Sequence, residues 1–513
     1  MLRFQHRVSK TFIKQQLIGL EAPAMVRPAE ILLKSLSVFV LLMLVSVLFP
    51  VNGVYFSPRA TLTFPSLQSI LGVGDDYSGV ISMDCSERGF FLAEQQPSRA
   101  SRSALPLTCT ADDIRALPIQ PIEYARNAED ALSGIMFDLA TLRINNRKLV
   151  RILHYGDSQL EADRVTHYLR GELQKEFGGG GVGYVTLNPQ IPVNPTVKIS
   201  MSPEWQFSTP AVKHKDSELL PVGYLLSSAT LSSKVEKNAW IKIDRRALKA
   251  YPPLRFARVK VMLTNSVAPT FFEARTPTQK LYSGVIQPAK DMQVLNVNMR
   301  SSRENVMLHF RGNGIPEVHG VGLDYNFGVA VDNIPLRSSS GVDFTKVSSE
   351  TLQRSLQLAN PKLIVMQFGA NVVPKITSSY SYYEEQLYEQ LMLLKRLQPS
   401  VNILVVGVAD MAQRIDGVMR SYPNIEKIRD AQKRAAFRAG CAFWDTFQAM
   451  GGRNSIVSWA YAQPALATKD FCHFSASGAT LVAELLYRSF RQEFSLYMAA
   501  HRAQPALHVA KKQ

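Results

Sequence analysis

The chain has 513 residues, of which 46% are hydrophobic and 19% are charged, and its formal net charge is +16. These proportions exclude a disordered chain, and the length exceeds that of one ordinary domain, so we expect two folded units with appended segments. The basic residues form no zinc-finger, RNA-binding or helix-turn-helix pattern. This disfavours a nucleic-acid-binding protein and favours an exported protein attracted to anionic surfaces.

The N-terminal region carries an uncharged apolar run, SLSVFVLLMLVSVLFPV, over residues 35–51. This run predicts a transmembrane helix within residues 31–56, near the lower limit of the length that spans a bilayer. Residues 1–30 are basic, so the positive-inside rule places them in the cytoplasm and exports the remainder to the periplasmic side of a bacterial inner membrane. A cleaved signal peptide is the alternative, but the lead-in is long for one and no clear A-x-A site follows.

The four cysteines are compatible with the oxidising compartment that this orientation implies. Three disulfide connectivities are possible, and we expect the pairing of neighbours, Cys85 with Cys109 and Cys441 with Cys472. Buried free thiols are the alternative. No C-x-x-C spacing indicates a metal site.

Three segments with different patterns follow the apolar run. Residues 57–125 are mixed and rich in Ser, Pro and Gly, and they predict an irregular stalk. Residues 126–188 contain a helical segment, a β-prone run that ends at Gly156 and an amphipathic helix that reaches Phe177. Between 189 and 320 the helical periodicity disappears and short β-prone runs alternate with turn residues, which predicts an inserted β-sandwich.

Residues 321–498 return to an alternation of strands and helices. The expected elements are strand 363–369, helix 382–397, strand 402–410, helix 425–440, strand 441–447 and helix 478–494. Strands separated by helices predict a parallel sheet covered on both faces, and hence an α/β fold. The basic residues 499–513 are expected to form a frayed tail.

Ser158 stands in a Gly-Asp-Ser tripeptide between an expected strand and an expected helix. A turn of this kind lifts a hydroxyl above the sheet, where backbone N–H groups and the helix N-terminus face developing negative charge. The serine is therefore a candidate nucleophile. The tripeptide alone is weak evidence, since turns are generally rich in these residues.

A base for this serine is found in DFCHFSASGA, where Asp470 stands three residues before His473 on a loop ahead of the last helix. The carboxylate can fix the imidazole tautomer, so that the other ring nitrogen accepts the serine proton. Asn371 follows the strand 363–369, and loops at the carboxyl ends of parallel strands converge on one crevice, where an amide can donate to an oxyanion. Cys472 is the poorer candidate nucleophile.

The motifs GDSQ at 156–159, FGAN at 368–371 and DFCH at 470–473 stand at the ends of successive α/β units. In this order they resemble the first, third and fifth sequence blocks of the SGNH (GDSL-like) hydrolases. The resemblance covers about residues 130–185 and 320–498. It implies a flavodoxin-like three-layer sandwich with a parallel sheet, interrupted here by the all-β insert.

Carried over by position, the resemblance implies that Ser158 is the nucleophile and that Asp470 and His473 complete its triad. The oxyanion hole would consist of the Asn371 amide, the N–H of Ser158 and one further backbone N–H. The implied chemistry requires no metal or organic cofactor.

The family's second block normally supplies a glycine for that further N–H. The best match here is VDNIPLRSSSG, in which Ser338 stands where the glycine is expected. A serine keeps the N–H but restricts the backbone if the site requires a positive φ. Gly341 in a shifted register is the alternative.

A β-sandwich inserted after the first helix resembles the arrangement in bacterial peptidoglycan O-acetylesterases, whose extra domain is similar to a carbohydrate-binding module. The resemblance implies a serine esterase that removes O-acetyl groups from a cell-envelope polysaccharide, with peptidoglycan preferred. A polysaccharide O-acetyltransferase with the same acyl-serine and a non-catalytic glycan-binding envelope protein are the alternatives. The implied partners are the acetylated glycan and the inner membrane, with a membrane acyltransferase as a further candidate and no nucleic acid.

Overall fold

A computed structural model describes most of the chain beyond residue 108. The described residues are 54–57, 60–62, 109–126, 128–145, 147–189, 194–210, 219–231, 238–248, 254–299 and 304–501. The chain divides into two compact units, residues 1–99 and residues 100–513.

The first unit contains the antiparallel strand pair β1 (Val54–Ser57) and β2 (Ala60–Leu62). Most of the predicted transmembrane segment, residues 31–53, lies outside the described residues, and its last residues belong to β1 instead. Within the described ranges, no helix has both the length and the apolar character needed to cross a bilayer.

A six-stranded sheet forms the centre of the second unit, in the order β16-β4-β17-β18-β21-β3. Its strands are β3 (Ile122–Glu123), β4 (Leu149–Gly156), β16 (Gly328–Pro335), β17 (Pro361–Gln367), β18 (Asn402–Val406) and β21 (Ala442–Trp444). All neighbours pair in parallel except β3, which pairs antiparallel with β21. The parallel strands, numbered along the chain, stand in the order 2-1-3-4-5 of flavodoxin-like sheets.

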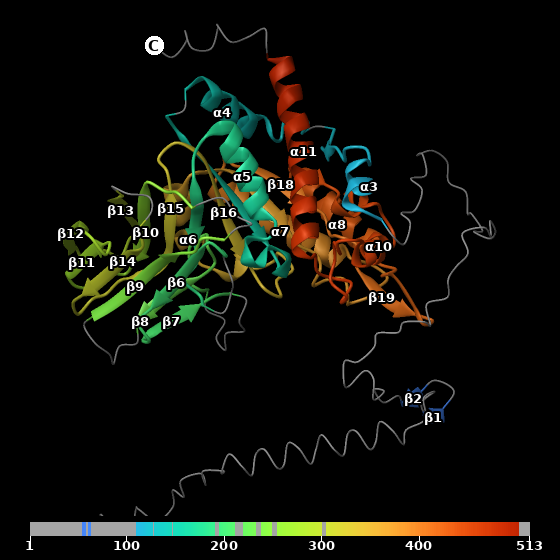
Figure 1. Cartoon of the computed structure of the whole chain (residues 1–513), viewed down its shortest axis with the longest axis horizontal. Helices are drawn as coiled ribbons and strands as arrows, with labels where there is room; N and C mark the ends of the chain where they lie inside the picture. Colours follow the sequence, from blue (N-terminus) through green and yellow to red (C-terminus); the bar gives the residue numbers. More distant parts are fainter. Residues whose placement is uncertain are drawn as a thin grey trace, which may run out of the picture. The chain divides into compact units, whose positions relative to one another are not determined.

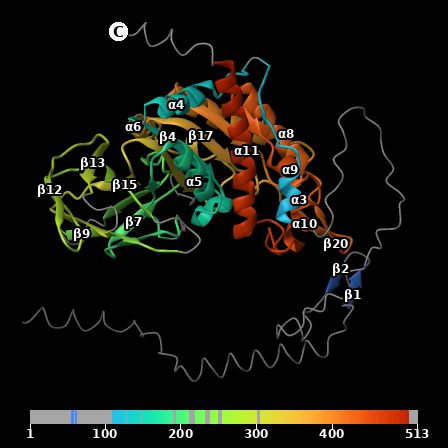
Figure 2. The same cartoon turned by 45° about the horizontal axis from the view of Figure 1, so that its top comes forward.

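Helices cover both faces of this sheet because its strands are apolar on both sides. Along β4, for example, Ile152 joins the core on one face and Leu153 the core on the other. One face is covered by α4 (Ser133–Ile144), α5 (Thr166–Phe177) and α11 (Ala476–Ala500), and the other by α6 (Ser349–Ala359), α7 (Ser381–Leu397) and α8 (Ile425–Arg438). The predicted α/β fold with a parallel sheet is confirmed (Figures 1 and 2).

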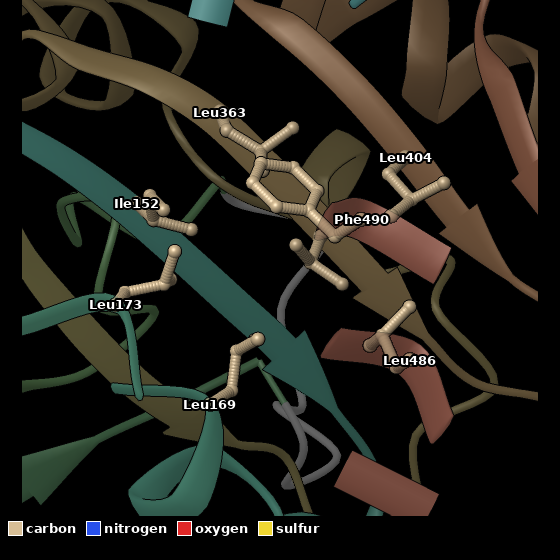
Figure 3. Close-up of a pocket in the computed structure, with 8 residues that line it drawn as sticks. Ile152, Leu169, Leu173, Leu363, Leu404, Leu486 and Phe490 are labelled. Atoms are coloured by element: carbon tan, nitrogen blue, oxygen red, sulfur yellow. The ribbon is translucent and has the colours of Figure 1, made fainter. Parts of the chain in front are cut away.

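The packing of α5 and α11 on the sheet is close. Figure 3 shows side chains from β4, β17 and β18 pointing toward side chains from these two helices. The void that they enclose has a volume of about 10 Å³, and its lining is apolar: Ile152, Leu169, Leu173, Leu363, Val365, Leu404, Leu486 and Phe490. A space of this size and polarity holds no ligand, so this face is hydrophobic core.

The insert consists of two antiparallel sheets. One contains β5 (Gly181–Val185), β7 (Trp205–Ser208), β8 (Ser228–Leu231), β10 (Arg258–Thr264), β13 (Gln293–Asn298) and β15 (Glu317–Asp324). The other contains β6 (Val197–Met201), β9 (Asn238–Arg245), β11 (Thr270–Arg275), β12 (Lys280–Ile286) and β14 (Val306–Arg311). Buried residues of both sheets, such as Val261 and Phe310, form one core. The strands span 181–324, whereas the sequence indicated 189–320.

A buried ionic cluster joins the insert to the parallel sheet. Arg151 on β4 pairs with Asp332 on β16 (2.5 Å) and with Asp324 on β15. Asp324 also pairs with Lys260 on β10 (2.9 Å), and Tyr224 Oη donates to Asp332 (2.9 Å). Arg151 and both aspartates are almost fully buried, so each charge needs its partners to offset the free energy that it loses with its hydration.

The remaining elements are short. They are α3 (Ala111–Arg115), a 3₁₀ helix (Ser158–Asp163), a 3₁₀ helix (Phe344–Lys346), the hairpin β19 (Ala412–Ile415) and β20 (Val418–Ser421), α9 (Thr446–Met450) and α10 (Ser455–Tyr461). Part of the predicted stalk is folded against the domain: Ile114 is fully buried and Arg115 pairs with Glu484 of α11 (2.9 Å). The prediction of an irregular stalk up to residue 125 is therefore wrong for residues 109–125.

Candidate active site

The candidate nucleophile lies at the carboxyl end of strand β4, between β16 and β17. We call residues 156–163 the nucleophile turn. Gly156 ends the strand, where a Cβ would approach the carbonyl oxygen of Gln367 on β17 to 2.7 Å, so this position requires glycine. Asp157 caps the 3₁₀ helix by accepting the backbone N–H of Gln159 (3.0 Å), and Ser158 is its first residue. The turn places Ser158 half-buried above the sheet.

The candidate base lies on residues 467–475, which we call the histidine loop and which connect α10 to α11. His473 Nε2 is 2.8 Å from Ser158 Oγ, and His473 Nδ1 is 2.7 Å from Asp470 Oδ2. An ionised carboxylate only accepts hydrogen bonds, so Nδ1 carries a proton toward Asp470 and Nε2 can accept the serine proton. The structure therefore brings the three predicted triad residues into one hydrogen-bonded chain.

The two carboxyl groups beside the serine are tuned in opposite directions. Burial raises the pKa of Asp157 to about 6, against the hydrogen bonds that it accepts from the backbone of Gln159 and Ala370. For Asp470, burial also favours the neutral form, but hydrogen bonds from Thr468, His473 and Cys472 outweigh it and lower its pKa below the usual range. Asp470 is thus an anion at neutral pH and can stabilise an imidazolium.

The predicted oxyanion donors lie on two loops beside the nucleophile turn. Asn371 is exposed, and its Nδ2 donates to the carbonyl oxygen of Ser339 (2.8 Å). An amide nitrogen carries two protons, so this bond orients the group and leaves one proton for an oxyanion.

Ser338 occupies the turn that follows β16. The N–H of Leu336 donates to the carbonyl oxygen of Gly156 (2.7 Å), which places this turn next to the nucleophile turn. Arg337 pairs with Glu161 through two contacts of 2.5 and 2.9 Å and strengthens the same contact. Ser338 has φ +63°, so the position does require the left-handed conformation that a glycine adopts without strain.

Gly341 fits the oxyanion role less well. Its φ is +85°, and a Cβ there would contact the ring of Phe368 at 2.7 Å, so packing explains this glycine. Its N–H already donates to Ser339 Oγ (2.9 Å). Ser338 is therefore the better candidate of the two.

Two side chains that sequence reasoning missed connect the nucleophile turn to the histidine loop. Gln159 Nε2 donates to the carbonyl oxygen of Cys472 (2.8 Å), and the N–H of Phe474 donates to Gln159 Oε1 (3.2 Å). Arg164 donates to the carbonyl oxygens of Ser158 (2.6 Å) and Phe474 (3.2 Å). In the sequence, the only sign of this connection is the glutamine that follows Ser158. Its partners are more than 300 residues away.

The cysteines depart from the expected pairing. Cys441 and Cys472 are free thiols, so their predicted disulfide is wrong, and Cys109 is a buried free thiol whose expected partner Cys85 lies outside the described residues. Cys441 directly precedes β21, whereas the Cys472 sulfur contacts the sulfur of Met411 (3.9 Å). Burial raises the pKa of the Cys472 thiol to about 12, which disfavours it as a nucleophile.

Among the residues that the structure describes, no group of three or more His, Cys, Asp and Glu side chains could hold a metal ion. A cavity of about 20 Å³ lies beneath the site, lined in part by Asp157, Gln367 and Thr446. It has room for one water and not for a substrate. The triad itself is open to solvent, because the side chains of His473 and Asp470 are 33% and 49% exposed.

Comparisons with protein-family models and with curated protein sequences give no match. Among solved structures, a peptidoglycan O-acetylesterase is similar with a TM-score of 0.57 and 19% identity, over 70% of this chain and 95% of that chain. A salicylyl-acyltransferase from a tetracycline biosynthetic pathway matches with a TM-score of 0.27 and 11% identity, over 63% of this chain and 98% of that chain. A family two carbohydrate esterase from Cellvibrio japonicus matches with a TM-score of 0.21 and 9% identity, over 58% of this chain and 99% of that chain.

Only the TM-score of the peptidoglycan O-acetylesterase among these three is high enough to establish a common fold. That fold includes most of the second unit, and its parallel sheet holds Ser158, Asn371 and His473 at the carboxyl ends of its strands. The chain therefore shares the fold of this peptidoglycan O-acetylesterase, which supports the expected resemblance at the level of the fold.

Proposed function

We propose that the chain is a serine esterase that removes O-acetyl groups from a cell-envelope polysaccharide, with peptidoglycan as the preferred substrate. The observation that carries the proposal is the hydrogen-bonded chain from Ser158 Oγ through His473 to Asp470. Such a chain activates a hydroxyl for attack on an ester.

The reaction follows from the positions of these groups. Ser158 Oγ attacks the acetyl carbonyl carbon while its proton passes to His473 Nε2, and Asp470 stabilises the imidazolium. The oxyanion accepts hydrogen bonds from the N–H groups of Ser158 and Ser338 and from Asn371 Nδ2. The C–O bond to the sugar then breaks, and the sugar oxygen takes the proton from His473. Water, deprotonated by His473, attacks the acetyl carbon, the bond to Ser158 Oγ breaks, Oγ takes the proton back from His473, and acetate is released.

Two observations support a polymeric glycan as the substrate. The triad is open to solvent, so an acetyl group can approach on a long chain without entry into a closed pocket. The similar solved structure is that of a peptidoglycan O-acetylesterase, and the likeness extends over 95% of its length. An open site also gives water access to the acyl-serine, which favours hydrolysis over transfer.

The test is the release of acetate from O-acetylated peptidoglycan and from an acetylated exopolysaccharide by the full-length protein. We expect release from peptidoglycan, and Ser158→Ala should reduce it to background, because loss of such a nucleophile costs a factor on the order of 10⁶. Asn371→Ala should lower kcat by about 10²- to 10³-fold through the loss of an oxyanion donor. Activity of Ser158→Ala equal to that of the parent would eliminate the assignment.

The alternatives give different products. If acetyl groups appear on an added acceptor glycan instead of in solution, the chain is an O-acetyltransferase. If a fluorophosphonate fails to label Ser158, the chain is a non-catalytic glycan-binding protein.

We also propose that the apolar run 35–51 anchors the chain in the inner membrane with the second unit outside. Protease accessibility in spheroplasts tests this orientation.

A further inference from the structure

The histidine loop must hold His473 at a fixed distance from Ser158, which lies on a different segment of the chain. His473 must remain 2.8 Å from Ser158 Oγ, yet it lies on a surface loop and its side chain is one-third exposed. The loop's internal bonds, such as that from the N–H of Thr468 to the carbonyl oxygen of His473 (2.8 Å), fix its shape. Phe471 and Phe474 are buried in the core, and the N–H of Ala412 donates to the carbonyl oxygen of Phe471 (3.0 Å), but none of these hydrogen bonds joins the loop to the nucleophile turn.

Gln159 supplies a connection of the required kind. Its side chain is bonded to the two peptide groups on either side of His473: it donates to the carbonyl oxygen of Cys472 and accepts from the N–H of Phe474. Only 4% of Gln159 is exposed, so water does not compete for these bonds. The carboxamide thereby imitates the paired donor and acceptor of a neighbouring β-strand.

The connection begins at the nucleophile itself. Gln159 follows Ser158 directly, and its own N–H is held by Asp157 Oδ1 (3.0 Å). A shift of the serine along the turn therefore moves the side chain that holds the histidine. Arg164 provides a second tie, from the carbonyl oxygen of Ser158 to that of Phe474.

We propose that Gln159 is a positioning residue for the catalytic base: it keeps His473 Nε2 within hydrogen-bond distance of Ser158 Oγ. Glutamine is required because a carboxamide offers a donor and an acceptor at its end, whereas a carboxylate has no donor and a thioether has neither in useful strength. The proposal rests on the esterase function proposed above. Loss of the tie should impair the chemical step and leave binding of the acyl group unchanged.

The experiment compares Gln159→Met, which preserves length and bulk, and Gln159→Glu, which preserves shape and one acceptor. With an acetyl-ester reporter, we expect kcat per labelled Ser158 to fall about 10²-fold in both, because misplacement by about 1 Å has this cost. KM should stay within about twofold of the parent value. Gln159→Asn, which keeps both groups on a shorter stem, replaces either variant that does not fold.

Gln174→Met is the matched control. Gln174 also joins two backbone segments, through bonds to the carbonyl oxygens of Gly181 (3.1 Å) and Val329 (3.2 Å), but it lies on α5 away from the triad. This variant should lose stability without a change in kcat. A kcat in Gln159→Met within about threefold of the parent, or an equal loss in Gln174→Met, would overturn the positioning role.

A crystal structure of Gln159→Met tests the same proposal without turnover. We expect the separation of His473 Nε2 and Ser158 Oγ to exceed 3.5 Å, the limit of a hydrogen bond. A separation that stays at the 2.8 Å of the parent contradicts the proposal. If the parent neither turns over esters nor reacts with a fluorophosphonate, the esterase function fails, and this distance still decides the role of Gln159.

Discussion

The nucleophile turn carries the candidate nucleophile and the histidine loop carries its candidate base, yet the two segments are stabilised in different ways. The nucleophile turn continues strand β4 and is closed by a buried pair between Asp163 and Arg170, in which both carboxylate oxygens are bonded (2.6 and 3.0 Å). The histidine loop leaves Asp470 and His473 open to solvent, and Asp470 accepts hydrogen bonds from Thr468, Cys472 and His473 within the loop. The contrast indicates that folding of the sheet fixes the serine, whereas local hydrogen bonds fix the shape of the loop that carries its base.

The same contrast extends to the carboxyl group in each region. Asp157 in the nucleophile turn is buried and its pKa is raised, whereas Asp470 in the histidine loop is half-exposed and its pKa is lowered. Asp157 therefore favours folding at low pH, and Asp470 favours folding once the pH exceeds its unfolded pKa. Substitution of Asp470 should therefore affect activity first, and substitution of the buried carboxylates in the turn, Asp157 and Asp163, should affect stability first.

The largest expected effect is on activity, in the histidine loop. Asp470→Asn should lower kcat by about 10³- to 10⁴-fold, because the amide no longer fixes the tautomer in which Nε2 accepts the serine proton. The midpoint of thermal unfolding should change little, since the side chain is half-exposed. Turnover and calorimetry on one preparation check both parts. A loss in kcat below tenfold would show that the base is oriented by other groups.

The next effect is on stability, in the nucleophile turn. Asp163→Asn leaves the buried Arg170 without its counter-charge and should reduce the unfolding free energy by about 3–5 kcal/mol. Denaturant titration measures this loss. Glu385→Gln is the control, because its pair with Arg438 is exposed on both sides and should contribute less than about 1 kcal/mol. Similar losses in the two variants would contradict the distinction between the regions.

The third effect concerns pH. Between pH 4 and 6 the unfolded chain loses the Asp157 proton while the folded chain keeps it, so the unfolding free energy should fall as pH rises. The contribution of this group is on the order of 2–3 kcal/mol, at about 1.4 kcal/mol per pKa unit. Asp157→Asn removes it, so the difference in unfolding free energy between parent and variant should vary over this pH range. A constant difference would mean that Asp157 titrates normally.

The smallest effect is at Ser338. The left-handed backbone conformation costs a non-glycine residue about 1–2 kcal/mol. Substitution by glycine removes this cost, but it also raises the entropy of the unfolded chain, which offsets part of the gain in stability. Ser338→Gly should therefore raise the unfolding free energy by about 0.5–1 kcal/mol and leave kcat equal or higher. Parallel denaturant and turnover measurements check this. A lower kcat would assign the Ser338 hydroxyl a part in the reaction.

Much of the fold could be predicted because local patterns decide it. The run LIVMQFG became β17, and the amphipathic segment 382–397 became α7 to within one residue. The geometry of Ser158, Asp470 and His473 could also be anticipated, since the carboxyl ends of parallel strands meet at one edge of the sheet. Their catalytic roles stay predictions.

The features that escaped prediction depend on contacts between distant segments. Residues 109–125 form only the short elements α3 and β3, and they are ordered by partners such as Trp444, whose indole donates to the carbonyl oxygen of Gln120 (3.2 Å). The disulfide prediction failed because membership of one domain does not bring Cys441 and Cys472 together. The role of Gln159 was invisible because both of its partners are backbone groups, which leave no mark on the sequence.

The buried ionic cluster at the base of the insert limits how the chain can be divided. Removal of residues 189–320 would delete Lys260 and Tyr224 and leave Arg151 and two aspartates in a half-open pocket. The remnant of β15 would also present an unpaired strand edge to solvent. The β-sheets of the insert are thus a structural part of the second unit, and they cannot be exchanged between proteins like an independent module unless the charges on both sides are exchanged as well.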